Sequence, residues 1–204
     1  RVHFIADEIA VGFGRTGTLF AHQQAGVKPD FLCLGKGLTG GYLPLSAVLT
    51  SDSVYQAFYD DYASLRAFLH SHSYTGNALA CAAANATLDL LDDPDLWTRI
   101  ETLGASLQQA LAPLLGHAHV SGLRRTGLIA AVDLVTDRAS GAAYPWQQRR
   151  GLRVYQHALN QGALLRPLGN TVYFMPPYAA TEDELRWLAG VAIEGIEAAT
   201  STSL

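Results

Sequence analysis

Short apolar runs and glycine-rich segments alternate in the first part of the chain. The runs at 2–6, 31–34 and 45–49 are four or five residues long and end at a polar residue or a glycine, so each predicts a buried strand. The segments 11–17 and 35–41 are rich in glycine and predict loops. This pattern favours an α/β arrangement in which short strands end in glycine-rich loops.

Helical spacing dominates the middle of the chain. Residues 77–91 are rich in alanine and predict a helix. Asp93 and Pro94 are typical of an N-cap followed by proline at the first helical position. From there, leucine and isoleucine recur at helical spacing, which predicts a long amphipathic helix that ends near Gly116. A shorter helix is expected over 53–59.

The last third of the chain predicts a mixture of strands and helices. Residues 128–135 predict a strand, and 147–160 predict a helix that Gly162 closes. Residues 163–169 and 171–177 predict two strands joined by a tight turn at the Gly-Asn pair between them.

A final helix and a domain boundary complete the prediction. Thr181 and Glu184 have the spacing of a capping box and open an amphipathic helix. We expect the α/β part to occupy residues 1–117 and a small α+β C-terminal domain to occupy 118–204.

Composition excludes several classes of protein. The chain is 49 % hydrophobic and 16 % charged, with a formal net charge of −4, so neither disorder nor a broad nucleic-acid surface is expected. No apolar stretch is long enough for a membrane span, and no signal peptide is recognisable. Cys33 and Cys81 lie inside apolar runs, and we expect buried thiols in a reducing, cytoplasmic compartment. Because the chain opens in the middle of a predicted strand, we also expect residues upstream that complete any site.

Lys36 is the most informative single residue. It follows the apolar run at 31–34 and lies between two glycines, whereas the other lysine, Lys28, lies in a polar turn. Burial disfavours a charged ammonium, and a neutral amine is what imine formation with an aldehyde requires. The alternative is a lysine that caps a strand and neutralises a nearby acid.

Asp7 and Glu8 follow the first predicted strand. Asp7 is placed at the carboxyl end of a strand, where open α/β sheets bind ligands, and could hold a cationic ring nitrogen. An ordinary acid that caps a loop is the alternative. Glu8 points to the other face of the strand and need not share this role.

Two further positions could bind anions. Ser73 and Thr75 precede the helix predicted from Asn77, where hydroxyl and backbone N–H groups can bind phosphate, although simple helix capping is also common there. His70 and His72 have no convincing third partner for a metal ion, so no metal site is expected. Arg166 lies within an apolar run and needs either an internal acid or a substrate carboxylate.

The motifs at these positions resemble a known family. The segments FIADEIAVGFGRTG, PDFLCLGKGLTGGYLPLSAVL and HSHSYTGNALACAAANATL are similar to those of the class III aminotransferases, pyridoxal-phosphate enzymes of fold type I. Lys36 follows Asp7 by 29 positions, which is also similar to the family's spacing. The resemblance covers nearly the whole chain and implies the C-terminal part of the large α/β domain followed by the small domain.

The resemblance assigns roles to individual residues. It implies that Lys36 forms the internal aldimine with pyridoxal 5'-phosphate and that Asp7 pairs with the pyridine nitrogen. Ser73, with His72 beside it, would contact the cofactor phosphate of the partner subunit in a homodimer with shared active sites. Two substrate contacts are implied, Arg166 on a carboxylate and Tyr173 in the same pocket. Ser71 matches a position near the substrate that is often glycine, which leaves that contact open.

The resemblance also implies a reaction. GYLPLSAVLT and LLRPLGNTVYFMPPY most resemble the family members that move an amino group from S-adenosylmethionine to 8-amino-7-oxononanoate in biotin synthesis. The alternatives are an ω-amino acid aminotransferase, an aminomutase or a decarboxylase of the same family, or an inactive fragment that serves only in dimerisation or binding.

Overall fold

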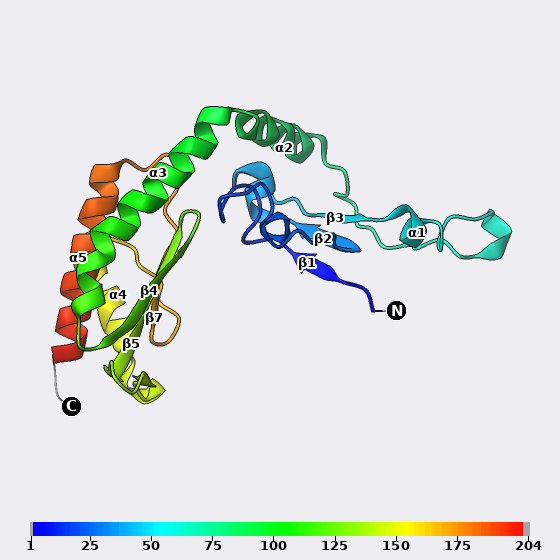
Figure 1. Ribbon diagram of the computed structural model, residues 1–204. Helices are drawn as coiled ribbons and strands as arrows, with labels where there is room; N and C mark the ends of the chain where they lie inside the picture. The colour runs from blue at the N-terminus through cyan, green and yellow to red at the C-terminus, as the bar shows by residue number, and fades with distance from the viewer. Residues whose placement is uncertain (1, 202–204) are drawn as a thin grey trace. The chain divides into compact units, whose positions relative to one another are not determined.

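The computed structural model describes residues 2–201, which form two compact units divided between Trp97 and Thr98 (Figure 1). The division falls earlier than the expected boundary after residue 117, because helix α3 (Pro94–Leu111) packs mainly with the second unit. Arg125 in that unit donates hydrogen bonds to Glu101 and Gln108 of this helix. Compact units and domains need not coincide, so the domain limits 1–117 and 118–204 stay a prediction.

The first unit contains a three-stranded sheet. Strands β1 (Ile5–Asp7) and β2 (Phe31–Leu34) are parallel, and β3 (Ala47–Thr50) is antiparallel to β2. The limits of β2 were predicted correctly, whereas β1 begins three residues and β3 two residues later than expected. The register places Asp7 opposite Cys33, so β1 and β2 end close together at the same edge of the sheet.

Helix α2 (Ala78–Leu91) and a 3₁₀ helix at Lys36–Thr39 complete the core of this unit. The core residues come from β1, β2, both helices and the loop after β1; they are Ala6, Phe13, Leu32, Leu34, Leu38, Ala84 and Leu91. The helix α1 (Asp52–Tyr55) is only one turn long, and further 3₁₀ helices lie at Ala21–Ala25 and Tyr62–Ser64. The loop that carries Lys36 is therefore fixed between a strand end and a helix.

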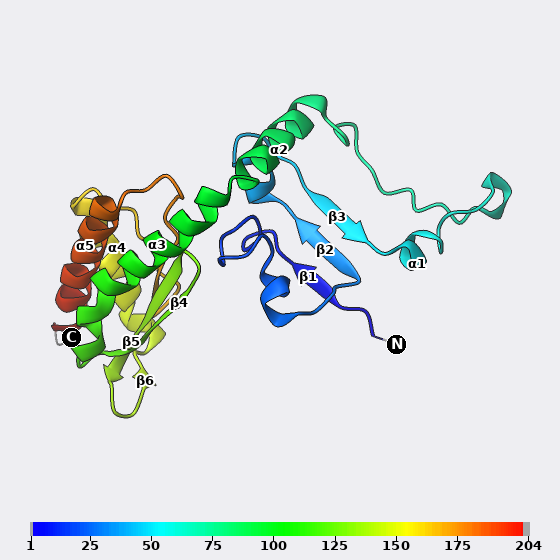
Figure 2. The ribbon, with the colours of Figure 1, turned by 45° about the horizontal axis from the view of Figure 1, so that its top comes forward.

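The second unit is an antiparallel sheet covered on one face by helices. Its strands are β4 (Val120–Thr126), β5 (Ile129–Asp137), β6 (Ala142–Ala143) and β7 (Thr171–Phe174), with β5 pairing to the other three. Besides α3, the helices are α4 (Arg150–Asn160) and α5 (Glu182–Ser201), with 3₁₀ helices at Ala112–Gly116 and Trp146–Gln148. Figures 1 and 2 show the helices on one side of the sheet, which leaves its other face uncovered within this unit.

Two sequence predictions differ from the structure here. The strand expected over 163–169 is wrong, because the only pairing in that segment is a single bridge between Leu168 and Thr171. Pro167 has no N–H to donate to a ladder, which explains why the segment is extended without being a strand. The strand β4 was not predicted, because its glycine and arginine pair obscure the alternation of buried and exposed positions.

The helix signals were more reliable. Asn77 caps α2 through its side chain, which accepts hydrogen bonds from the N–H groups of Leu79 and Ala80, both at 3.1 Å. The capping box is confirmed: Thr181 N–H donates to Glu184 Oε2 at 2.7 Å, and Glu184 N–H donates to Thr181 Oγ1 at 3.2 Å. Within residues 2–201, no helix has both the length and the apolar character needed to cross a membrane.

Two helical glycines offer a matched test of how closely helix α3 packs against the turn between β4 and β5. A Cβ atom on Gly104 of α3 would lie 2.3 Å from the backbone oxygen of Gly127, whereas a Cβ on Gly190 of α5 would meet nothing within 4 Å. We expect Gly104→Ala to destabilise the intact protein by roughly 1–3 kcal/mol through overpacking against backbone. Gly190→Ala should instead stabilise it by up to about 1 kcal/mol through helix propensity. Denaturant unfolding of both variants checks this prediction. Equal changes in the free energy of unfolding would contradict the close approach of α3 to Gly127.

Candidate active site

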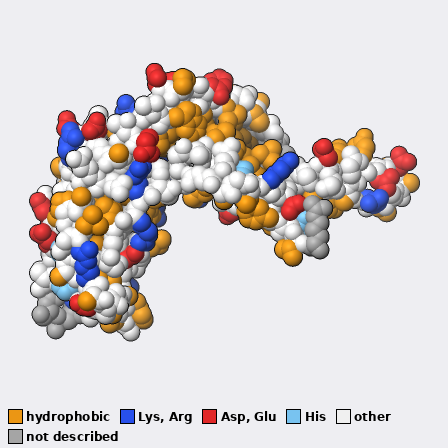
Figure 3. All heavy atoms as spheres, in the orientation of Figure 1, with side chains coloured by type: hydrophobic (Ala, Val, Ile, Leu, Met, Phe, Trp, Pro, Cys, Tyr) orange, Lys and Arg blue, Asp and Glu red, His pale blue; other side chains and the backbone are white. Residues whose placement is uncertain are grey.

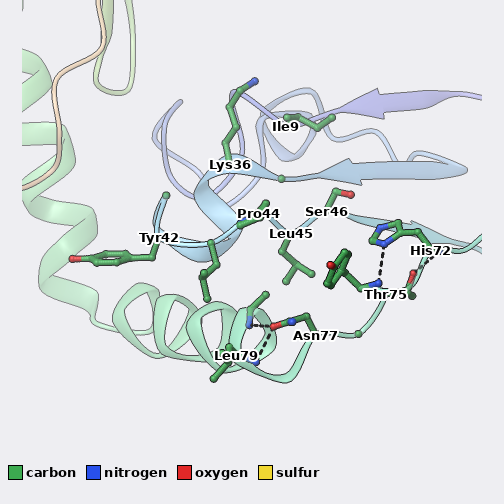
Figure 4. Close-up of a pocket in the computed structure, with 16 residues that line it drawn as sticks. Ile9, Lys36, Tyr42, Pro44, Leu45, Ser46, His72, Thr75, Asn77 and Leu79 are labelled. Carbon is green, nitrogen blue, oxygen red and sulfur yellow. Dashed lines mark hydrogen bonds between the residues drawn. The ribbon is translucent and has the colours of Figure 1, made fainter.

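Lys36 begins a tight turn directly after the buried strand β2. Its backbone has a φ of 42°, in the left-handed region that non-glycine residues rarely occupy. The turn is closed by hydrogen bonds from Leu38 N–H to Gly35 O and from Gly40 N–H to Gly37 O, both at 3.0 Å. The backbone is thus fixed, while the Lys36 side chain is exposed and extends away from helix α2 (Figure 4).

Asp7 ends the neighbouring strand and is exposed, whereas Glu8 is buried. The carboxylate of Asp7 accepts one hydrogen bond, from the N–H of Ile9 at 3.1 Å, which leaves most of its acceptor capacity for a ligand. The predicted alternation of the two acids is therefore confirmed. Because β1 and β2 are parallel neighbours, the structure brings Asp7 and Lys36 to the same edge of the sheet.

A pocket of about 900 Å³ adjoins Lys36. It is lined by four separate parts of the first unit and by the start of α2, namely Ile9, Gly35, Lys36, Gly41, Tyr42, Leu43, Pro44, Leu45, Ser46, His72, Tyr74, Thr75, Gly76, Asn77, Leu79 and Ala80. The sequence analysis did not single out Ile9 or Tyr42. Ile9 could have been found from its position two residues after Asp7, but Tyr42 carries no signal beyond its glycine neighbours.

The segment before α2 contains the predicted phosphate ligands. His72 N–H donates to Thr75 Oγ1 at 3.1 Å, and His72 Nδ1 accepts from Tyr74 N–H at 3.1 Å. Ser71 and Ser73 are exposed and do not line the pocket, whereas His72 does. Asn77 already satisfies two N–H groups of the first helical turn, so the hydroxyl groups of Ser73 and Thr75 are the stronger candidates for an anion.

Arg166 and Tyr173 belong to the second unit. Arg166 is exposed, and no hydrogen bond or ion pair joins it to any other residue within 2–201. Tyr173 is half-buried on β7, opposite Ala131 of β5. The structure therefore does not supply the internal acid that was one of the two explanations for Arg166.

One acid of the same unit, Asp133, is already paired with another arginine and is not available to Arg166. Asp133 accepts two hydrogen bonds from the Arg124 guanidinium and one from the Thr171 hydroxyl at 2.7 Å. The Arg124 guanidinium holds the pKa of the Asp133 carboxyl below its ordinary value, against the opposing effect of burial. Asp133 is thus an ionised partner of Arg124 at neutral pH, and Arg166 is left as an exposed cation.

Two other observations bear on the chemistry. Cys33 and Cys81 are free but only half-buried, so the expectation of buried thiols is corrected. Among the described residues, no group of three or more His, Cys, Asp or Glu side chains is arranged to hold a metal ion.

Comparisons with known proteins place this arrangement in a family. The family model of the class III aminotransferases matches residues 1–196. The adenosylmethionine-8-amino-7-oxononanoate aminotransferase of Helicobacter pylori is 49 % identical over 189 residues, which cover 91 % of this chain and 42 % of that protein. The corresponding protein of Nitratidesulfovibrio vulgaris is 45 % identical over 199 residues, which cover 98 % of this chain and 37 % of that protein.

Solved structures agree with the sequence comparisons. The crystal structure of adenosylmethionine-8-amino-7-oxononanoate aminotransferase from Methanocaldococcus jannaschii superposes with a TM-score of 0.91 at 39 % identity, covering 97 % of this chain and 46 % of that one. An omega transaminase from Pseudomonas jessenii, in complex with PMP, superposes with a TM-score of 0.90 at 32 % identity. The match covers 98 % of this chain and 44 % of that one. The predicted fold class, fold type I α/β, is thereby confirmed, and the chain spans less than half the length of these relatives. By sequence and by structure, the chain belongs to the class III aminotransferases.

Proposed function

We propose that this chain forms the C-terminal part of a pyridoxal-phosphate-dependent aminotransferase that moves an amino group from S-adenosylmethionine to 8-amino-7-oxononanoate. One observation carries the proposal: Asp7 ends β1 and Lys36 lies two residues after the end of β2, its parallel neighbour, in a chain that belongs to this family. The names of its most similar relatives support these two substrates over those of the ω-amino acid aminotransferases, aminomutases and decarboxylases.

The residues present fit pyridoxal 5'-phosphate. The cofactor has an aldehyde, a pyridine nitrogen and a phosphate, and the first unit offers an exposed amine, an exposed carboxylate and a pair of exposed hydroxyl groups. Gly41, which lines the pocket beside Tyr42, has a φ of 84° and nothing within 4 Å of where a Cβ would lie, so the pocket wall is open at this position. When bound, the cofactor supplies an electron sink for a carbanion at the substrate carbon.

Each residue then has a distinct task. Lys36 would hold the cofactor, and its amino group would take and return a proton at the substrate carbon. The Asp7 carboxylate would bind the pyridine nitrogen through a charge-assisted hydrogen bond. Ile9 lines the pocket together with Lys36 and would help to exclude water from it.

A homodimer with shared active sites is part of the proposal. Every residue of the segment 55–79, which we call the aromatic arm, is exposed, and Figure 3 shows hydrophobic side chains along it at the right of the view. Its large apolar side chains are Tyr55, Phe58, Tyr59, Tyr62, Leu65, Phe68, Leu69, Tyr74 and Leu79. Monomers rarely expose such a patch, so we place a second copy of the chain over the arm, with Ser73 and His72 reaching the partner's cofactor phosphate.

Arg166 and Tyr173 are the substrate contacts proposed for the second unit. An exposed guanidinium without an internal acid is suited to a bidentate contact with the carboxylate of 8-amino-7-oxononanoate. Tyr173 would line the same pocket, and Ser71 would lie near the substrate without an assigned bond. The two free cysteines suit the reducing compartment of a cytoplasmic enzyme.

We predict that Lys36 is the lysine that binds the cofactor. The alternative in this chain, Lys28, lies in a turn outside the pocket. Borohydride reduction of the full-length holoenzyme, followed by peptide mapping, should therefore place the pyridoxyl label on Lys36. A label on Lys28 or on a lysine upstream of this chain would refute the proposed site.

Dimer formation should depend on the aromatic arm. Replacing Tyr62 and Phe68 together by serine removes two large exposed side chains, each worth about 1.5–3 kcal/mol when fully buried. We expect the dimer to dissociate in light scattering, and added cofactor to oppose dissociation by mass action. Trp146→Ser, which removes an exposed aromatic from the second unit, is the matched control and should leave the dimer intact. A fully active monomer would contradict shared sites.

Arg166→Ala should weaken binding of 8-amino-7-oxononanoate. We expect a loss of roughly 2–5 kcal/mol, the range for a charge pair that becomes desolvated in a complex. Arg166→Lys should rescue binding poorly because it lacks the planar fork. Arg138→Ala removes another exposed arginine of the same unit and serves as the control. Steady-state kinetics and cofactor absorbance check this: loss of cofactor with unchanged affinity for the oxo acid would make Arg166 a cofactor or structural residue.

A further inference from the structure

Glu8 is a buried acid to which the proposed chemistry gives no task. It is only 2 % exposed, although it follows the exposed Asp7. Its carboxylate accepts hydrogen bonds from the N–H groups of Ala21 at 2.8 Å and His22 at 2.7 Å, and a third from His22 Nδ1 at 3.1 Å. A buried carboxylate is tolerated only with such partners, so Glu8 closes the loop between β1 and the 3₁₀ helix at Ala21–Ala25.

A continuous series of ring contacts leads from Glu8 toward Lys36. The His22 ring stacks on Phe20 with centroids 5.9 Å apart, and Phe20 meets Phe13 edge to face at 5.6 Å. Phe13 is 4 % exposed and packs against Gly37, where an added Cβ would lie 3.1 Å from the Phe13 ring. The loop that Glu8 closes therefore rests directly on the turn that begins at Lys36.

Phe13 and Lys36, the residue before Gly37, both have unusual backbone conformations. Phe13 has a φ of 59° and Lys36 a φ of 42°, and neither is a glycine. Such conformations persist only when the surrounding structure holds them. On the side of Lys36, the Thr39 hydroxyl donates to Leu43 O at 2.5 Å, and on the side of Phe13 the N–H of Gly12 donates to Glu8 O at 2.8 Å.

We propose that Glu8 is a positioning residue for Lys36, acting through His22, Phe20 and Phe13 on the Lys36 turn. The inference rests on the proposed function only in calling Lys36 the cofactor lysine. Without the carboxylate, the loop loses the acceptor for two backbone N–H groups, Phe13 is no longer pressed against Gly37, and the turn relaxes from its left-handed conformation.

The test compares Glu8→Gln with a matched control in the full-length protein. Glutamine keeps the size of the side chain but offers one acceptor oxygen in place of two. The control, Gln24→Ala, removes a different tether of the same loop, the hydrogen bond from Gln24 Nε2 to Thr16 O at 2.6 Å. Amide hydrogen exchange of the cofactor-free protein should rise about ten-fold at Leu38 and Gly40 in Glu8→Gln and stay unchanged in Gln24→Ala.

A second readout separates positioning from general loosening. The rate at which the cofactor-free protein takes up pyridoxal phosphate, followed by absorbance, should fall about ten-fold in Glu8→Gln alone, while the exchange of the β2 amides stays at the wild-type rate. Faster exchange confined to Ala21 and His22, or an equal increase throughout β2, would overturn the proposal.

A substitute variant and a measurement without cofactor cover the cases in which Glu8→Gln does not fold or the proposed function fails. If Glu8→Gln does not fold, His22→Phe takes its place, because it keeps a ring against Phe20 and removes the ring nitrogen that contacts Glu8, while both backbone N–H donors stay. A smaller rise in exchange at Leu38 and Gly40 is then expected, and unchanged exchange there overturns the proposal. The exchange measurement uses no cofactor. A pyridoxyl label on another lysine would therefore refute the proposed function, whereas the effect of Glu8 on the Lys36 turn is tested separately by amide exchange.

Discussion

The left-handed conformation of Lys36 is the constraint on which the first unit depends. A lysine that continued β2 in extended form would point its side chain to one face of the sheet, whereas the turn that begins at Lys36 keeps the chain from continuing the strand beyond Leu34. The conformation is unfavourable for a residue with a Cβ, so the flanking glycines, the Thr39 hydroxyl and the buried Phe13 ring must hold it. Much of the small core of this unit, from Leu34 to α2, surrounds that one turn.

The features that the sequence predicted well have local causes. The limits of β2 follow from four apolar residues and a glycine, and the start of α2 follows from an asparagine whose side chain reaches two N–H groups. The capping box of α5 is equally local. In each case the stabilising partners lie within a few residues, so the pattern in the sequence contains the whole cause.

The features that were not predicted have causes that the apolar pattern alone does not show. β4 is a strand because β5 pairs with it, although its own residues are polar and include a glycine. Residues 163–169 have the apolar character of a strand, but Pro167 lacks the N–H that a ladder needs. For the candidate site, the placement of Asp7 and Lys36 at strand ends could be predicted, because Asp7 ends β1 and Lys36 comes two residues after β2. The contact of Phe13 with Gly37 joins residues 24 positions apart and has no signature in the sequence.

The two adjacent acids show how one strand end can serve chemistry and structure together. Successive residues of a strand point to opposite faces, so Asp7 is exposed where a ligand can reach it and Glu8 is buried where only the protein can. An aspartate at position 8 could not replace Glu8, because its side chain is one methylene shorter and would not reach the N–H groups of Ala21 and His22 equally well. A ligand-binding acid at a strand end needs rigid surroundings, since a mobile carboxylate gives up part of its binding energy to ordering. Glu8, the next residue along the chain, provides that rigidity because its buried carboxylate is held by hydrogen bonds. Asp7 and Glu8 therefore act together and not as two independent acids.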